Sequence, residues 1–297
     1  MAINAIEVAV PERHLAERTW RAAVWLFVRK NPLGALGGLL MVLLIVAAIF
    51  ADVLATHNPV RTSGRVLVPP GAEFWLGTDN LGRDLWSRVV HGSRISLIVG
   101  LASTLLGAGA GGLIGLVSGY LGGKVDLIAQ RLMDIMQALP ILVLALVMAA
   151  ALGPSLMNTI IAISVVIVPR AARLIRSSVL AIREFVYIES ARAIGVSHRR
   201  VAFRHILPNT VGPFIVLVTA QLGGAILGEA ALSYLGLGVP EPYPWWGRML
   251  SIAAAEYAQK APWLVIFPGL AISLAVFGTN LLGDALRDKL DPRLRGS

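Results

Sequence analysis

Two carboxyl side chains stand inside long apolar runs, where an ionisable group is costly and is therefore a functional candidate. Glu229 lies in the run ILGEAALSYLGLG, and Asp134 lies in RLMDIMQALP. Such groups could line a path across a membrane, or they could join neighbouring helices by hydrogen bonds. Asp134 is three residues from Arg131, a helical spacing that favours a structural ion pair, whereas Glu229 leaves both interpretations open. Three milder polar residues are further candidates for the path: Gln137, Ser233 and Asn280.

The sequence contains no arrangement of residues that predicts an enzyme. It has no cysteine, which excludes thiol catalysis, thiolate metal sites and disulfides. None of its five histidines lies well inside an apolar run, and neither a His-Glu-x-x-His pattern nor a Gly-x-x-x-x-Gly-Lys-Ser/Thr loop occurs. We therefore expect no catalytic residue, no metal site and no cofactor in this chain.

A basic segment between two apolar runs carries a more informative pattern. The stretch ESARAIGVSHRRVAFRHILPN spans residues 189–209, with apolar side chains at roughly helical spacing on both sides of Gly195. Glycine accepts the backbone conformation of a tight turn, so we expect two short helices joined there. Pro208 should end the second helix, because the residue before a proline is biased away from the helical region. A solvated basic loop would explain the arginines but not the apolar face, so the segment predicts an amphipathic hairpin that docks onto a partner.

The elements that must hold these residues are membrane-spanning helices. Of the 297 residues, 56% are hydrophobic and 14% are charged, whereas an ordinary soluble domain has about 25% charged residues. A spanning helix needs roughly 20 apolar residues. The stretch LGPS at 152–155 divides the longest apolar run into two. We expect six spans, at 33–55, 95–119, 127–151, 154–178, 210–236 and 262–284.

The basic residues are distributed unevenly between the two sides that these spans define. Of the 26 Lys and Arg residues, 19 fall in segments on one side, namely 1–32, 119–131, 170–204 and 285–297. The positive-inside rule then predicts that both termini and the hairpin are cytoplasmic. The same distribution explains the net charge of +9 without nucleic-acid binding.

Small residues follow one face of the second expected span. Glycine recurs there at every fourth position, and in lipid such a stripe lets two helix backbones approach closely. We expect a packing seam against another helix of this chain or of a partner. The seam residues are Gly107, Gly111, Gly115 and Gly119, with Gly123 beyond them.

The remaining segments are expected to lie at the membrane surfaces. The cytoplasmic tail 1–32 could contain an interfacial amphipathic helix at 18–30, and 285–297 forms a second cytoplasmic tail. After a first helix at 33–55 comes an extracytoplasmic loop, 56–94, in which RDLWSRVVHG could rest on the membrane as a short helix. Trp245 and Trp246, in a second outer loop, suit an aromatic belt. The core with five spans covers 95–284, with the docking segment at 183–208.

The docking segment resembles a cytoplasmic motif in the membrane subunits of ATP-binding-cassette importers, which reads Glu-Ala-Ala, three residues, Gly, nine residues, Ile-x-Leu-Pro. Two positions depart from it, since Ser190 replaces an Ala and His205 stands where the motif has Ile. The stretches LGTDNLGRDLWSRVVHGSRISL (76–97) and LSYLGLG (232–238) look like the C-type permease of the dipeptide, oligopeptide and nickel importers. The residues that the resemblance assigns to ATPase coupling are Glu189, Ser190, Ala191, Gly195, His205, Ile206, Leu207 and Pro208.

The resemblance implies an all-α polytopic permease of type I importer fold, with cytoplasmic coupling helices, in the bacterial inner membrane. It implies four kinds of partner: a second permease in a heterodimer, two ATPase subunits that bind ATP and magnesium, an extracytoplasmic solute-binding protein, and lipid. The cargo, a peptide or a related small solute, is not fixed by it. An alternative is a secondary, ion-coupled transporter that uses Glu229 and Asp134. That alternative predicts inverted repeats, of which the halves show no convincing sign, and it leaves the hairpin unexplained.

Overall fold

The computed structural model describes residues 20–238 and 240–290, and within them the chain is helical, without a β-strand. Five helices are long and apolar enough to cross a membrane. The expected all-α, multi-span architecture is confirmed. The five helices are α2 (Pro32–Ile49), α4 (Leu85–Leu121), α7 (Leu156–Ile182), α10 (Val211–Tyr234) and α12 (Trp263–Leu290).

The third expected span, 127–151, is not one straight helix. It is divided between α5 (Gly123–Ala138) and α6 (Ile141–Leu152), which meet at 95°. Between them, Leu139 has extended backbone and is followed by Pro140. Proline disfavours the helical conformation of the residue before it and supplies no N–H to the helix, so the break falls at this dipeptide.

The second expected span begins ten residues earlier than 95. Asp84 caps α4, because its side chain accepts a hydrogen bond of 2.9 Å from the backbone N–H of Ser87. The stretch RDLWSRVVHG is therefore mostly the first part of α4, not a separate helix on the membrane surface. The preceding connection ends at residue 84 instead of 94, and it begins after α3 (Ala51–Leu54), which continues α2.

The central contact of the fold is α4 against α7. A Cβ atom on Gly111 would lie 2.4 Å from the carbonyl oxygen of Val168, and one on Gly115 would lie 2.3 Å from that of Ala172. These distances are shorter than any van der Waals contact, so the approach of the two backbones requires glycine. The stripe thus forms a seam within the chain. Gly107 and Gly119 belong to the same row, whereas Gly123 lies beyond the end of α4.

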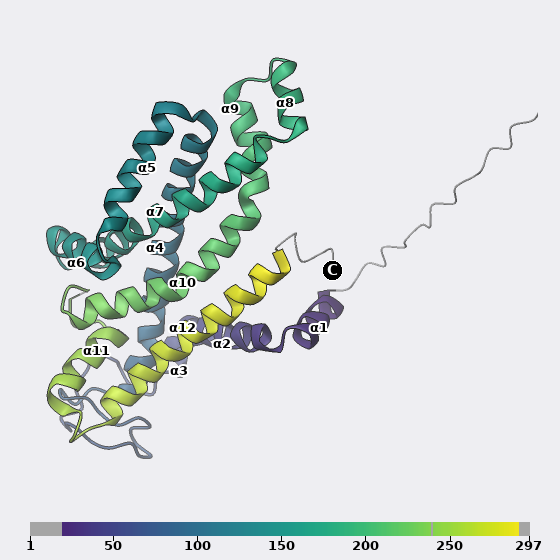
Figure 1. The fold of residues 1–297 in the computed structure, drawn as a ribbon. Coiled ribbons are helices and arrows are strands. Elements are labelled where there is room, and N and C mark those ends of the chain that lie inside the picture. The colour runs from purple at the N-terminus through teal and green to yellow at the C-terminus, as the bar shows by residue number, and fades with distance from the viewer. Residues whose placement is uncertain (1–19, 239, 291–297) are drawn as a thin grey trace, which may run out of the picture.

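The two ends of the bundle carry different structures (Figure 1). At one, which we call the hairpin end, α8 (Val186–Ala193) and α9 (His198–Arg200) project beyond the long helices. At the other, the loop end, the connection 55–84 lies beside α11 (Trp246–Ile252), which continues into a π-helical turn, η3 (Ala253–Tyr257). The helices α2, α4, α10 and α12 also pack on one another.

The paired tryptophans do not form an aromatic belt. Trp245 is fully buried and Trp246 is 2% exposed. The indole N–H of Trp246 donates a hydrogen bond of 2.8 Å to the carbonyl of Val89, and its ring lies against Gly92 on α4. These rings therefore fasten the loop-end segment to α4.

The expected tails fall partly outside the described residues, which begin at 20 and end at 290. Within the first tail, α1 (Trp20–Lys30) occupies the segment expected to form an interfacial helix, and Trp25 is 65% exposed on it. α12 continues to Leu290, so the first residues of the second expected tail, 285–297, are helical.

Candidate docking hairpin and transport cavity

The hairpin turns at Gly195. Its φ is +81°, and no atom lies within 4 Å of the place where a Cβ would stand, so backbone conformation and not crowding requires glycine. The N–H of Val196 bonds the carbonyl of Ala191, and that of Gly195 bonds the carbonyl of Arg192. This pair of bonds is the Schellman arrangement that ends a helix. The expected turn between two short helices is present.

Pro208 does not end the second helix. Leu207 has helical φ and ψ of −52° and −46°, and the chain runs from α9 through a π-helical turn, η1 (Val201–Ile206), and a 3-10 turn, η2 (Leu207–Thr210), into α10. Proline cannot donate the usual hydrogen bond, and the change of turn type lets the helix continue around the missing bond. The second arm of the hairpin is thus continuous with a spanning helix.

The inner face of the hairpin is anchored on the long helices. Ile188, Val201 and Ile206 are fully buried. They pack in one apolar cluster with side chains near the ends of α4 and α7, among them Leu116 and Val179. The hairpin therefore packs on the ends of α4 and α7 and is continuous with α10.

The outer face of the hairpin is largely exposed in the part of the chain that the structure describes, although Arg192 lies over the ring of Tyr120 and Tyr187 accepts a hydrogen bond from Asn209. Ile194 is 81% exposed and Val186 is 76% exposed. Glu189 is exposed, and its carboxylate has no hydrogen bond or ion pair within residues 20–238 and 240–290. An apolar tip beside an unpaired carboxylate is typical of an interaction site. Further exposed residues of this face are Phe185, Tyr187, Arg192, Arg199, Arg200, Phe203 and Arg204.

The other residues that the resemblance assigns to ATPase coupling differ in how far they are buried. The hydroxyl of Ser190 donates to the carbonyl of Val186 within α8, 2.9 Å away. Ala191 is buried against the hairpin interior, whereas His205 and Leu207 are half-buried and Pro208 is exposed. Ile206, which is fully buried as Val201 is, lies next to the His205 that departs from the motif.

Glu229 is buried between α10 and α4, with 1% of its surface exposed. Ser233, one turn further along α10, donates a hydrogen bond of 2.8 Å to it, and Ser96 of α4 donates one of 3.3 Å. The bond from Ser96 to Glu229 therefore joins two helices, while Ser233 holds the carboxylate from within α10. Asn280 is exposed on α12, beside Gly223 of α10.

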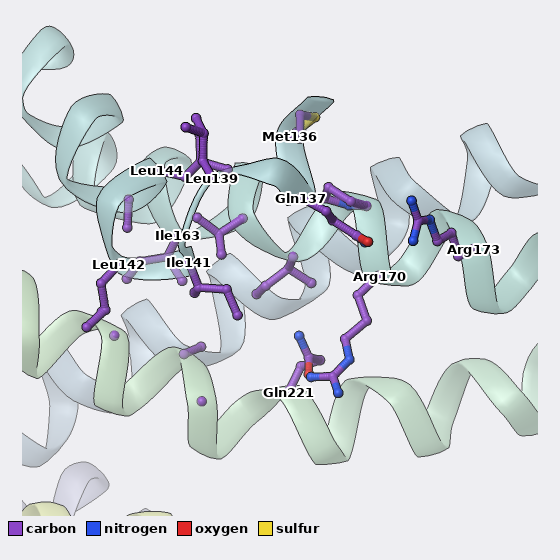
Figure 2. Close-up of a pocket in the computed structure, with 17 residues that line it drawn as sticks. Met136, Gln137, Leu139, Ile141, Leu142, Leu144, Ile163, Arg170, Arg173 and Gln221 are labelled. Carbon is purple, nitrogen blue, oxygen red and sulfur yellow. The ribbon is translucent and has the colours of Figure 1, made fainter. Parts of the chain in front are cut away.

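A cavity of about 610 Å³ lies between the bent pair α5/α6 and the helices α7 and α10 (Figure 2). Ile141 on its wall is 67% exposed, so the cavity opens onto the surface of this chain. Of the four residues expected to line a path, only Gln137 lines this cavity. Its walls are otherwise mostly apolar, with three further polar side chains: Arg170, Arg173 and Gln221.

The two arginines were not predicted as site residues. The expected fourth span, 154–178, already contains both positions, but the positive-inside pattern attributes them to the basic segment 170–204. In the structure α7 continues to Ile182, so both lie well within its length. An arginine at the centre of a spanning helix costs about 2.5–3.5 kcal/mol of insertion free energy, and this cost marks it as a functional candidate. Applying this cost to the expected span itself would have marked both residues.

The cavity arginines have different partners. Arg173 lies 2.5 Å from the carboxylate of Asp134, which Arg131 also approaches at 3.5 Å. Arg170 donates one hydrogen bond of 3.2 Å to the side-chain oxygen of Gln221 on α10. Asp134 thus has the structural ion pair that its spacing predicted, and it gains a second one across helices.

The loop end is held by buried charges. Asp79 and Arg83 form an ion pair of 2.6 Å, and Arg83 reaches Glu241 at 3.0 Å, which links the connection 55–84 to the segment before α11. Beside it, hydrogen bonds from Arg94 and His91 hold the pKa of Asp52 below its usual range. The loop end is therefore a fixed surface and not a set of free loops.

Comparison with known proteins identifies families along nearly the whole described chain. Residues 111–296 match the family described as binding-protein-dependent transport system inner membrane component. Residues 19–70 match the N-terminal transmembrane domain of oligopeptide transport permease C.

Curated relatives cover almost the full length. The dipeptide transport system permease protein DppC of Alkalihalophilus pseudofirmus is 43% identical over 96% of this chain and 93% of its own length. The di/tripeptide transport system permease protein DppC of Pseudomonas aeruginosa is 46% identical over 89% of each. The glutathione transport system permease protein GsiD of an Escherichia coli strain is 40% identical over 99% of this chain and 97% of its own. The chain therefore belongs to the family of binding-protein-dependent transport system inner membrane components, as a C-type permease subunit of an ATP-binding-cassette importer and not an enzyme.

Proposed function

We propose that this permease forms half of the path by which a bacterial inner-membrane importer takes up peptides or related small solutes, driven by ATP. The observation that supports it most is the hairpin, whose apolar tip is exposed and whose Glu189 is unpaired among the described residues, while its second arm is continuous with α10. A hairpin joined in this way to a spanning helix can pass the movement of a docked partner on to that helix.

We propose the following assembly around the chain. A second permease subunit completes the path as a heterodimer, with lipid around both. Two ATPase subunits bind ATP and magnesium, and one of them receives the hairpin, with Glu189, Val186 and Ile194 in its groove. A solute-binding protein delivers cargo at the loop end.

The distribution of basic residues supports an orientation in which the hairpin end faces the cytoplasm. The outer face of the hairpin carries four arginines, and basic residues concentrate on the cytoplasmic side of membrane proteins. The hairpin end and both termini are accordingly cytoplasmic, and the loop end with the connection 55–84 faces outward.

The packing suggests how ATP binding reaches the path. The ATPase moves the hairpin, and the hairpin moves α10 directly and α7 through the cluster around Ile188. These two helices form walls of the cavity. Its shape therefore follows the state of the ATPases, a rigid-body change of the kind that switches transporters.

The cargo class follows from the relatives, whose names specify dipeptides, di- and tripeptides, and glutathione. All of these are short peptides. The ion-coupled alternative is less well supported, because Glu229 is enclosed by two serines and Asp134 is held by two arginines.

Co-purification and uptake test the proposal together. A tagged chain should bring two ATPase chains and a second permease with it. Proteoliposomes containing this complex should take up dipeptide when the binding protein and ATP are supplied, and not when the Walker lysine of the ATPases is replaced. Uptake that follows an ion gradient and ignores ATP would contradict the proposal.

A further inference from the structure

The cavity between α7 and α10 contains a cation whose charge is not balanced. Arg170 extends from α7 toward Gln221 on α10 and donates its single hydrogen bond there (Figure 2). In the part of the chain that the structure describes, no carboxylate pairs with its guanidinium. Because arginine carries five N–H donors, most of its capacity to bind an anion is unused.

Arg173 provides the contrast within the same cavity. It lies one turn further along α7 and is paired with Asp134 at 2.5 Å. Asp134 is shared with Arg131, so it compensates the charge of Arg173 in part. Arg170 differs in having a neutral amide as its partner and no carboxylate among the described residues.

The remaining walls fit a small molecule with one anionic end. Ile141, Leu142 and Ile163 supply apolar surface, and the amides of Gln137 and Gln221 stand on α5 and α10 around Arg170 (Figure 2). Amides can both donate and accept hydrogen bonds, so they suit the peptide groups of many sequences.

We propose that Arg170 is a specificity-determining residue of the path, which receives the free carboxylate of solutes as they cross. This inference rests on the proposed function, since it assumes that solute passes through the cavity. The guanidinium matches a carboxylate with two parallel hydrogen bonds. An anion leaving water is strongly disfavoured unless it meets such a partner.

The hydrogen bond between Arg170 and Gln221 provides a way for the solute carboxylate to leave Arg170 again. When no solute is present, Arg170 bonds a neutral amide and not a carboxylate. A passing solute therefore displaces a weak partner and can be displaced by it in turn. Transport needs binding that is favourable enough for entry and weak enough for release.

Uptake of a peptide and of its C-terminal amide tests the role. The complete importer, with its binding protein, is reconstituted with the wild-type chain, Arg170→Gln or Arg170→Lys, and uptake of Ala-Ala and Ala-Ala amide is measured. Arg170→Gln should lower uptake of the free acid about tenfold relative to the amide, because glutamine can donate one of the two hydrogen bonds but carries no charge. Arg170→Lys should retain most of the preference. Because the binding protein is identical throughout, its own selectivity cancels in this ratio.

Arg173→Gln is the matched control, since it removes an arginine that is already paired. Any change that it causes should affect both peptides equally. Equal effects of Arg170→Gln on both peptides, or no effect, would overturn the proposal.

A charge-restoration experiment does not depend on transport of the amide. The chain has no cysteine, so Arg170→Cys introduces one reactive thiol. Aminoethyl methanethiosulfonate, which attaches a cation, should restore dipeptide uptake, and the sulfonatoethyl reagent, which attaches an anion, should not. Equal recovery with both, or no reaction at position 170, would overturn the proposal. Treating the wild-type complex with each reagent is the control, because it measures the effect of reaction with cysteines of the partner subunits.

Failure of the proposed function and failure of the inference about Arg170 give different results. A wild-type complex that shows no ATP-driven uptake of any peptide overturns the proposed function and this inference together. A wild-type complex that transports normally, with Arg170 variants that do not discriminate, overturns only the inference.

Discussion

The polar side chains on the spanning helices differ in the partners that they contact. Glu229 meets Ser96 and Ser233 and is sealed from solvent, so it serves the contact between α4 and α10. Arg170 meets one neutral amide and lies in a cavity. The sequence pattern marks the carboxylate but not the arginine, because Arg170 stands where the expected span 154–178 overlaps the basic segment 170–204, whose arginines are attributed to the cytoplasmic side.

Replacing Glu229 by glutamine should leave ATP-driven uptake within about twofold of wild type, because the amide preserves both serine contacts. Glu229→Ala should destabilise the assembled permease by about 2 kcal/mol or more, since it leaves a cavity and two buried hydroxyls without partners. Thermal unfolding of the purified complex measures the second effect. Abolition of uptake by Glu229→Gln at normal stability would instead favour a proton-carrying role.

At the scale of elements, the glycine seam decides how closely α4 and α7 pack. A side chain at Gly115 would overlap the backbone of α7. Gly109 on the same helix has nothing within 4 Å of its Cβ position, and it therefore provides a control with equal helix propensity.

Gly115→Ala should destabilise the complex by about 1–3 kcal/mol through overpacking, and Gly115→Leu by more. Gly109→Ala should be neutral or slightly stabilising, because alanine favours helix. The melting temperatures of the two variants in detergent measure the difference. Equal melting temperatures would mean that the seam is not closely packed.

The turn of the hairpin depends on one backbone conformation. Gly195→Val places a β-branched residue at φ +81°, which costs about 1–2 kcal/mol and distorts the docking face. We expect dipeptide uptake per ATP hydrolysed to fall several-fold while the chain remains in the membrane. Gly212→Ala, in the continuous helix that follows the turn and with open space around it, should leave this ratio unchanged. Normal coupling in Gly195→Val would argue against a role of the turn.

At the scale of the whole molecule, apolar runs and charge bias predict the number and order of helices well, because burial in lipid acts on average composition. They predict bends and ends poorly. Leu139–Pro140 breaks a helix while Leu207–Pro208 does not, and the difference depends on the turn types that tertiary packing allows. Trp246 is buried because Gly92 opposes it, a contact between residues distant in sequence.

The proposed orientation predicts that a thiol reagent added outside the cell reaches the loop end and not the hairpin end. Because the chain lacks cysteine, Val66→Cys in the connection 55–84 and Arg192→Cys in the hairpin give single labels at exposed positions. An impermeant maleimide should label position 66 in right-side-out vesicles and position 192 only after permeabilisation. The reverse pattern would invert the topology.

The most direct test of the account is a photo-cross-link from the hairpin tip. A photoreactive amino acid replaces Ile194 in the assembled importer, with the same residue at Val66 as a control at the loop end. Irradiation should join position 194 to an ATPase subunit, and position 66 should give no such product. An importer in which position 194 cross-links to no ATPase, or instead to the solute-binding protein, would contradict the central claim that the hairpin receives the ATP-driven movement.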